Sequence, residues 1–209
     1  MSLGLHRRAM GSVRLPAAFK RVNYVMNDAT NGIVYIDTGV PAMENNTFFA
    51  DAQLVDVDEN SQTLWGGRKS AMSPEMGNQL SFTKSSGCVQ FCVGVYALGP
   101  AHDRLRHSWK SECVEGVKRL CRDGALCVSL EPDGFTAGPN VYLFATNNSG
   151  AAMFGGGSLR LFSFRAWTDG VLVRDFVPCV RASDGVPGLY DLAGNAFYAP
   201  QGPGALTAG

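Results

Sequence analysis

Short runs of strand-forming residues, separated by turn-forming clusters, recur along most of the chain. Branched and aromatic residues are enriched in strands because they pack well on a pleated surface. Several such runs at short intervals are typical of an all-β sandwich or barrel. We therefore expect an all-β fold. The runs that predict its main strands are residues 32–40, 48–57, 88–98, 140–147, 158–167 and 171–180.

One of these runs is apolar on both sides. Alternate residues of a strand point to opposite faces of a sheet. In this run Val141 and Leu143 share one face, and Tyr142 and Phe144 share the other. Such a pattern indicates a strand that is covered on both faces. We therefore expect two stacked layers, as in a two-sheet sandwich.

Residues 109–124 allow two interpretations. Apolar side chains recur at helical spacing from Trp109 to Cys121, which would give one apolar helical face. Gly116 interrupts this pattern, and Asp123–Gly124 followed by "ALCVSL" is equally typical of a hairpin. We favour two strands over a helix.

The run at 171–180 carries two charged residues at its centre, Arg174 and Asp175. An unpaired charge is costly to bury, so each residue needs a partner or belongs to a site. Asp184 and Asp191 follow closely and can pair with an arginine. We interpret Arg174 and Asp175 as a structural clamp that holds loops to the sandwich, and not as a catalytic pair.

The preceding turn predicts a register. If Asp169–Gly170 forms a two-residue turn, Trp167 faces Leu172 across the hairpin, and Arg165 faces Arg174. Two opposed cations would then need an acid nearby.

Charge and hydropathy exclude several partners. Eighteen basic and eighteen acidic residues cancel, so we expect no nucleic-acid partner. No run of apolar residues is long enough to cross a membrane, so we expect no membrane insertion.

The basic residues 1–14 are expected to form a tethering arm, with the folded domain over residues 15–209. No signal-peptide pattern follows the basic start, so we expect synthesis in the cytoplasm.

Motifs for metals, cofactors and catalysis are absent or incomplete. Six cysteines include no C-x-x-C pair, and none of the three histidines adjoins a cysteine. We therefore predict no metal, no cofactor and mostly reduced, buried thiols. Residues 56–62 alternate like a calcium loop but lack its glycine and its glutamate. Residues 150–157 lack the lysine of a phosphate-binding loop. We predict no catalytic residues.

A weak ligand site is suggested by two polar stretches. "LWGGRKS" combines Trp65, a glycine pair and Arg68, and "TNNSG" supplies the amides of Asn147 and Asn148. Aromatic rings can pack against the C–H face of a sugar, and amides and guanidinium groups can bond its hydroxyls. These four residues are our candidate ligand contacts. Other aromatic candidates are Tyr96, Trp109 and Trp167.

The C-terminal sequence, read from "NVYLFATNNSG" through "LRLFSFRAWTDGVLVRDFVPCVRASDGVPGLYDL" to the end, resembles a concanavalin A-like (LamG-like) jelly-roll module. Such modules are common in proteins of phages, prophages and gut bacteria. "LPAAFKRVNYV", "YIDTGV" and "LWGGRKS" extend the resemblance to about residue 15. It implies an antiparallel jelly-roll sandwich of curved sheets, with strands near both chain ends paired side by side.

The resemblance also bears on function. Glycan-binding members bind on the concave face or its rim loops, and catalytic members carry an E-x-D-x-x-E strand motif that this chain lacks. We therefore expect a non-enzymatic recognition module, displayed on a phage particle or bacterial surface, that binds a carbohydrate or another host-surface ligand. The alternative is a structural module of the same assembly that packs against neighbouring subunits, with residues 1–14 as the anchor. An enzyme with a noncontiguous site is the third hypothesis.

Overall fold

The computed structural model describes residues 14–57, 61–70, 77–131, 135 and 137–209. These residues form two β-sheets and no helix, and the sheets pack face to face as a sandwich. The prediction of an all-β, two-sheet jelly-roll sandwich is confirmed. Nowhere in the described ranges does a helix reach the length and apolarity that crossing a membrane requires. Of the expected basic arm, all but Arg14 lies outside the described residues, so that domain boundary stays a prediction.

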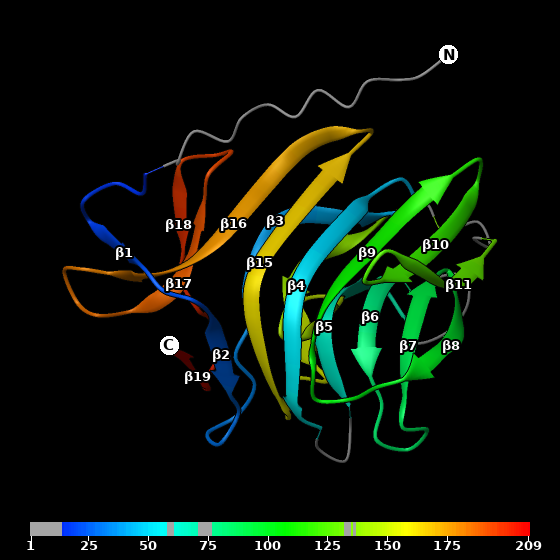
Figure 1. Ribbon diagram of the computed structural model, residues 1–209, viewed down its shortest axis with the longest axis horizontal. Coiled ribbons are helices and arrows are strands. Elements are labelled where there is room, and N and C mark those ends of the chain that lie inside the picture. Colours follow the sequence, from blue (N-terminus) through cyan, green and yellow to red (C-terminus); the bar gives the residue numbers. More distant parts are fainter. Residues whose placement is uncertain (1–13, 58–60, 71–76, 132–134, 136) are drawn as a thin grey trace.

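The larger sheet carries the longest strands, which curve side by side across the front of the molecule (Figure 1). Its order is β11 (Ala125–Leu130), β10 (Val117–Arg122), β9 (Arg106–Val114), β4 (Thr47–Asp56), β15 (Ser158–Thr168), β16 (Val171–Arg181), β17 (Pro187–Asp191) and β18 (Ala196–Tyr198). In addition, β1 (Phe19–Arg21) pairs with β16, and β2 (Val25–Asp28) pairs with both β15 and β19 (Ala205–Ala208). Strands near the two chain ends are therefore neighbours, as expected from the resemblance.

The smaller sheet lies behind the larger one in Figure 1. Its order is β14 (Ala151–Met153), β13 (Thr146–Asn148), β5 (Gln62–Arg68), β6 (Asn78–Phe82), β7 (Cys88–Val93) and β8 (Val95–Ala101). In addition, β12 (Ala137–Leu143) pairs with β5 and with β3 (Ile36–Met43). The pairing of β13 with β5 is parallel, whereas the other strand pairs of the described residues are antiparallel.

Aromatic side chains join the two sheets at the centre of the core. Phe48 on β4 and Phe164 on β15 stack with ring centroids 5.7 Å apart, and Trp65 on β5 lies 5.8 Å from Phe48. All three are fully buried. Burying each such side chain stabilises the fold by about 1.5–3 kcal/mol. The run at 141–145 is buried at every position, as its apolar residues on both faces predict.

Residues 106–130 form strands, so the favoured interpretation is confirmed and the helix is excluded. The structure has three strands here, β9, β10 and β11, because two turns interrupt the stretch. Glu115–Gly116 and Asp123–Gly124 both adopt positive φ angles, which residues at the centre of a tight hairpin turn require. Only the second of these turns follows from the sequence pattern.

The hairpin between β15 and β16 has the predicted turn but a different register. Trp167 faces Leu172 as expected. An irregularity between Ala166 and Trp167 then shifts the pairing by one residue, so that Arg165 faces Asp175 and not Arg174. The predicted pair of opposed arginines is therefore wrong, because the bulge replaces it with an ion pair.

The six cysteines are all free thiols. Only Cys92 and Cys179 are buried, so the expectation of buried thiols holds for these two and not for the four partly exposed ones. Burial raises the pKa of Cys92 to about 12 and that of Cys179 to about 11. Both thiols are therefore un-ionised at neutral pH, which makes them unreactive.

Candidate functional site

Trp65 does not offer its ring to a ligand. Its side chain is fully buried between the sheets, and its indole Nε1 lies 3.4 Å from the Asn78 Oδ1 that accepts its hydrogen bond. The glycine-rich stretch around it is not a loop but β5, every residue of which is buried. The prediction that Trp65 is a ligand contact is wrong, because β5 is an interior strand covered on both faces.

The other three predicted contacts do come together. The parallel pairing of β5 with β13 places Asn148 beside Arg68 and Asn147 beside Gly67. Arg68 Nε donates to Asn148 Oδ1 at 3.1 Å, and its guanidinium group lies 4.8 Å from the Phe154 ring centroid. Burial lowers the pKa of Arg68, opposed by the nearby Cys92 thiol. The structure therefore brings Arg68, Asn147 and Asn148 together, with Arg68 bonded to Asn148.

The amide of Asn147 is also bonded to the chain itself. Its Nδ2 donates to the Asn140 carbonyl at 2.9 Å, and its Oδ1 accepts from the Gly150 amide at 2.7 Å. Asn147 is 3% exposed and Arg68 8%. This geometry gives a ligand role for Arg68, Asn147 and Asn148 no support. Of the other aromatic candidates, Trp109 is buried, Trp167 is half-buried and Tyr96 is exposed.

Arg174 and Asp175 connect strands. Arg174 Nε donates to the Thr38 carbonyl of β3 at 2.8 Å, and the same nitrogen lies 3.7 Å from Oδ2 of the buried Asp191. Asp175 Oδ1 accepts from Arg165 Nε at 3.0 Å. Arg174 thus links the larger sheet to the smaller one, and Asp175 links β16 to β15. The other acid considered, Asp184, pairs with Arg181. That the pair stabilises the fold stays a prediction.

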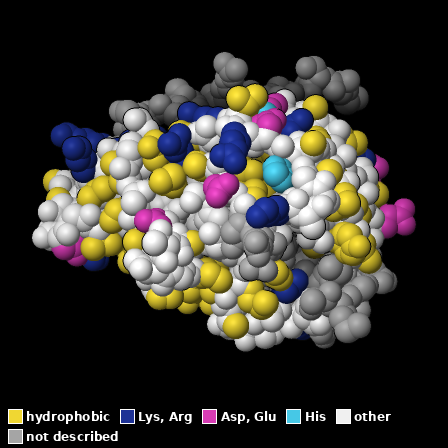
Figure 2. Space-filling model, turned by 90° about the horizontal axis from the view of Figure 1, so that it is seen from below, with side chains coloured by type: hydrophobic (Ala, Val, Ile, Leu, Met, Phe, Trp, Pro, Cys, Tyr) yellow, Lys and Arg dark blue, Asp and Glu magenta, His cyan; other side chains and the backbone are white. Residues whose placement is uncertain are grey.

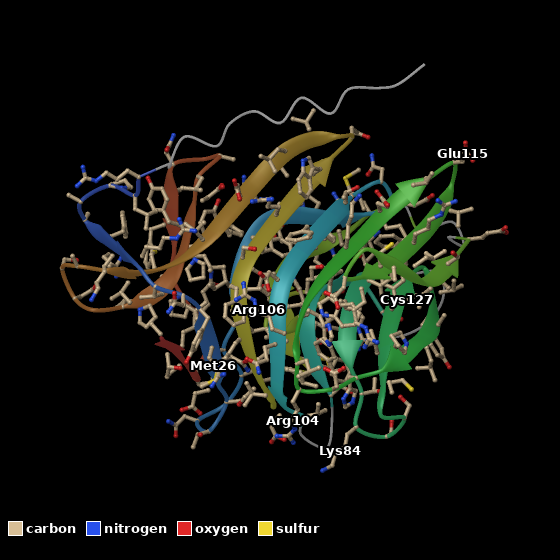
Figure 3. All side chains as sticks on the ribbon, in the orientation of Figure 1. Met26, Lys84, Arg104, Arg106, Glu115 and Cys127 are labelled. Carbon is tan, nitrogen blue, oxygen red and sulfur yellow. The ribbon has the colours of Figure 1, made fainter. Side chains whose placement is uncertain are left out.

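A groove of about 450 Å³ lies on the outer face of the larger sheet, at a place that the sequence analysis did not indicate. Two outward side chains, Arg106 of β9 and Phe162 of β15, form its floor. The link from β1 to β2 forms its wall. Figure 3 shows Arg106 at the middle of this face. The residues that define the groove are Arg21, Val22, Asn23, Tyr24, Arg106 and Phe162.

Two aromatic rings lie between two guanidinium groups in and beside the groove. The guanidinium carbon of Arg106 lies 3.8 Å from the Phe162 ring centroid. The Tyr24 ring meets Phe162 edge-on at 5.6 Å, and Arg160 lies 4.9 Å from the Tyr24 centroid. Each exposed cation–π contact contributes about 0.5–1 kcal/mol. We call these four residues the arginine–aromatic ladder.

Polar partners fix the ladder at both ends. Arg106 Nε donates to Asp51 Oδ1 at 2.7 Å and its Nη2 donates to the other carboxylate oxygen. This hydrogen bonding to Asp51 raises the pKa of Arg106, so the guanidinium is permanently charged. At the other end, Arg160 Nη1 donates to Gln53 Oε1 at 3.1 Å.

Gly209 holds the wall of the groove. The Gly209 carbonyl accepts from the amides of Asn23, at 2.7 Å, and Tyr24, at 3.1 Å. Because β2 also pairs with β15, the Tyr24 ring is carried to the side of Phe162. The groove is therefore preformed, and it presents two rings, two guanidinium groups and an exposed amide.

A second cavity lies at one end of the sandwich. It has a volume of about 780 Å³, and His102 is the one aromatic side chain among the described residues that line it. Lys84 and Arg104 lie at this end in Figure 3, and Figure 2 shows acidic, basic and histidine side chains gathered there. Arg104 and Asp56 pair with each other at 3.3 Å, so the charges of this end pocket are partly satisfied internally.

A calcium site at residues 56–62 has no support from the described part. Gln62 is fully buried, and its Nε2 donates to the carbonyls of Thr63 and Phe144. Asp58 and Asn60 lie outside the described residues. Among the residues that the structure describes, no three His, Cys, Asp or Glu side chains gather as a metal site would need.

Comparison with solved structures supports the fold. The chain matches a candidate carbohydrate-binding protein from Bacteroides ovatus over 90% of its length, with a TM-score of 0.61 and 11% identity, and spans 60% of that protein. It also matches the CBM40 module of the Ruminococcus gnavus IT-sialidase bound to α2,3-sialyllactose (TM-score 0.45, 16% identity, 69% of this chain, 90% of that one). A third match is the carbohydrate-binding module CBM66 of Bacillus subtilis (TM-score 0.41, 13% identity, 69% and 91%).

The likeness to the Bacteroides ovatus protein agrees with the class that the fold defines, the two-sheet jelly-roll sandwich. No protein-family model and no curated protein matches the sequence.

Proposed function

We propose that this chain is a carbohydrate-binding module without catalytic activity, and that the groove on the larger sheet is its binding site. The observation that carries the proposal is the arginine–aromatic ladder, three members of which, Arg106, Phe162 and Tyr24, line an open, preformed groove. The fold shared with the Bacteroides ovatus protein, itself described as a candidate carbohydrate-binding protein, points the same way.

The groove has the chemistry that sugar recognition uses. Rings such as Tyr24 and Phe162 pack against apolar C–H faces, while the Asn23 amide and the guanidinium N–H groups can bond hydroxyls. Because hydrogen bonds between chain segments hold the groove open, little conformational entropy is lost on binding.

The groove is better suited to carbohydrate binding than to glycoside hydrolysis. Glycoside hydrolysis uses two carboxyl groups that flank the scissile bond. The described residues that line the groove include no carboxylate, and both oxygens of neighbouring Asp51 accept hydrogen bonds from Arg106. We accordingly propose that ligands are bound and released unchanged.

The biological setting that we propose follows from the jelly-roll resemblance. The module would be made in the cytoplasm and then displayed on a phage particle or bacterial surface, with residues 1–14 joining it to other subunits. Deleting residues 1–14 should then release the module from the particle without changing its affinity for a glycan. Retention on the particle after the deletion would contradict this role of the arm.

Phe162→Ala tests the binding site. We expect it to lower the affinity for any glycan found on an array by about tenfold or more, measured by calorimetry. The matched control is Phe49→Ala, since Phe49 lies on neighbouring β4 with Arg165 at 5.9 Å from its ring but outside the groove. Equal affinities of the two variants would refute the site. New reducing ends released from the bound glycan would refute the non-enzymatic role.

An exposed apolar edge favours a second candidate function, structural packing in an assembly. Tyr96 and Leu98 on β8 are 55% and 52% exposed, and Leu126 on β11 is 58% exposed. These strands are the edges of the two sheets, where unpaired backbone groups favour association. If this function is the main one, Leu126→Lys should abolish incorporation into particles. The wild-type protein should then bind no glycan.

A further inference from the structure

Cations outnumber anions around the groove. Three arginines, Arg21, Arg106 and Arg160, lie in or beside it, and Asp51 is the carboxylate that bonds one of them. Several arginines elsewhere on the described surface each pair with an aspartate. Such pairs are Arg104–Asp56, Arg165–Asp175 and Arg181–Asp184. Since the chain as a whole is neutral, this excess of positive charge is local to the groove.

Arg106 and Arg21 keep guanidinium donors for a ligand. Arg106 uses Nε and Nη2 on Asp51, and no described residue accepts from its Nη1. Arg21 is exposed and forms no ion pair with any described residue. Arg160 lies beside the groove and is not counted among these donors, because its Nη1 bonds Gln53 and its Nε is buried.

We propose that the groove selects acidic saccharides, in which a carboxylate or sulfate group lies between Arg21 and Arg106 while the sugar ring packs on Tyr24 and Phe162. The inference rests on the proposed function and narrows it to a class of ligand. A guanidinium fork matches the two oxygens of a carboxylate or sulfate, and such charge-assisted bonds are about twice as strong as neutral ones.

A pair of probes that differ only in charge tests the proposal. Trigalacturonate carries three carboxylates, and its methyl ester has the same sugar skeleton without charge. We expect the acid to bind at least about tenfold more tightly than the ester, as measured by calorimetry. Sulfated dextran oligosaccharides and unsulfated dextran form a second arm that separates sulfate from carboxylate recognition.

Arg21→Gln tests the residue assignment. Arg21 is exposed, so this variant should unfold at the wild-type temperature but lose about tenfold in affinity for whichever acidic probe binds. The control is Arg119→Gln on β10, which removes the same charge. In the pairing of β10 with β9, Arg119 lies opposite Glu112. Glu112 is six residues along β9 from Arg106, so Arg119 lies about 20 Å from Arg106. The control should retain wild-type affinity.

The outcomes separate the two proposals. Tight binding of the ester or of plain dextran, with no gain from charge, would overturn selection for acidic saccharides but leave carbohydrate binding intact. Equal losses in Arg21→Gln and Arg119→Gln would overturn the groove as the place where charge is recognised. If no saccharide of any kind binds, both proposals fail.

Discussion

Lys118 is a lysine with no exposed surface, which is rare because burying an ammonium group is costly. Its Nζ donates to the carbonyls of Glu44, at 2.8 Å, and Asn46, and so holds the turn from β3 to β4. Burial lowers its pKa to about 8 from 10.5, a shift that the nearby Cys113, Glu44 and Glu112 oppose.

This lowered pKa predicts a pH-dependent stability. Between about pH 8 and 10.5 the unfolded chain binds a proton at Lys118 that the folded chain does not, so this residue's contribution to the unfolding free energy rises with pH. The raised pKa values of Cys92, Cys179 and Tyr142 act in the opposite direction in alkali. The difference between wild type and Lys118→Met isolates the lysine.

We expect the unfolding free energy of the wild type minus that of Lys118→Met to rise from pH 8 to pH 10, by about 1 kcal/mol per pH unit. Urea denaturation at several pH values measures it. The control variant is Lys20→Met, at an exposed position. A flat difference for Lys118→Met would show that the lysine titrates normally.

His107 predicts a response at lower pH. Its ring nitrogens lie 2.6 Å from Asp123 Oδ2 and 2.9 Å from Asp103 Oδ1. These contacts join the residues before β9 to the turn after β10, and we call them the His107 clamp. Desolvation lowers the pKa of His107, but the hydrogen bonds and charges of Asp123 and Asp103 outweigh it and raise the pKa overall. A raised pKa means that the clamp is complete below about pH 6.5 and is lost as pH rises through the folded value.

The two aspartates set the acid limit of the clamp. Their pKa values are lowered, because hydrogen bonds from backbone amides and from His107 outweigh desolvation. Their contribution is therefore lost as pH falls below the ordinary value of 3.8. His107→Gln should cost most stability at pH 5–6 and progressively less above pH 7, by thermal unfolding. An NMR titration that finds the His107 pKa at or below 6.5 would refute the clamp.

At the scale of the element, the glycine pair of β5 has a packing reason that the sequence analysis missed. A Cβ atom on Gly67 would lie 2.8 Å from the Pro139 carbonyl and 3.0 Å from the Ala42 side chain. A Cβ atom on Gly66 would lie 2.8 Å from the Thr146 hydroxyl. The pair lets β12 and β13 approach β5 closely and does not mark a loop.

Gly67→Ala should therefore destabilise the fold by about 1–3 kcal/mol through overpacking. The matched control is Gly138→Ala on β12, where the new Cβ atom would meet nothing closer than 3.3 Å. Urea denaturation measures both. Equal stability of the two variants would show that the β5 backbone moves to accommodate the methyl group.

The clamp on β16 also belongs to this scale. Asp191 Oδ1 accepts from the amides of Asp175 and Ala193, while its Oδ2 has Arg174 as the nearby cation. Removing one partner of a buried ion pair leaves an uncompensated charge. Arg174→Met should therefore lower the unfolding free energy by about 2–4 kcal/mol. Arg181→Met, which breaks an exposed pair on the same strand, should cost less than about 1 kcal/mol.

The class of the fold was predictable because its signals are local. Alternating runs and turn residues such as Asp169–Gly170 identify strands whatever their partners are. The groove was not predictable in this way, since it joins the link from β1 to β2, Gly209 and single side chains of β9 and β15. One usable signal existed: in the run at 158–167, Arg160 and Phe162 alternate with the core residues Leu159 and Leu161 and so must face outward.

The neutrality of the whole molecule makes a last prediction possible. With equal numbers of acidic and basic residues, no long-range field attracts an acidic ligand, so its binding must come from direct contacts in the groove. Salt screens charges beyond about 10 Å at 0.1 M and beyond about 3 Å at 1 M, the length of a direct contact. Trigalacturonate should therefore lose only severalfold in affinity between these salt concentrations, and its methyl ester should lose none. A loss of a hundredfold or more would mean that diffuse attraction, and not contact with Arg21 and Arg106, holds the ligand.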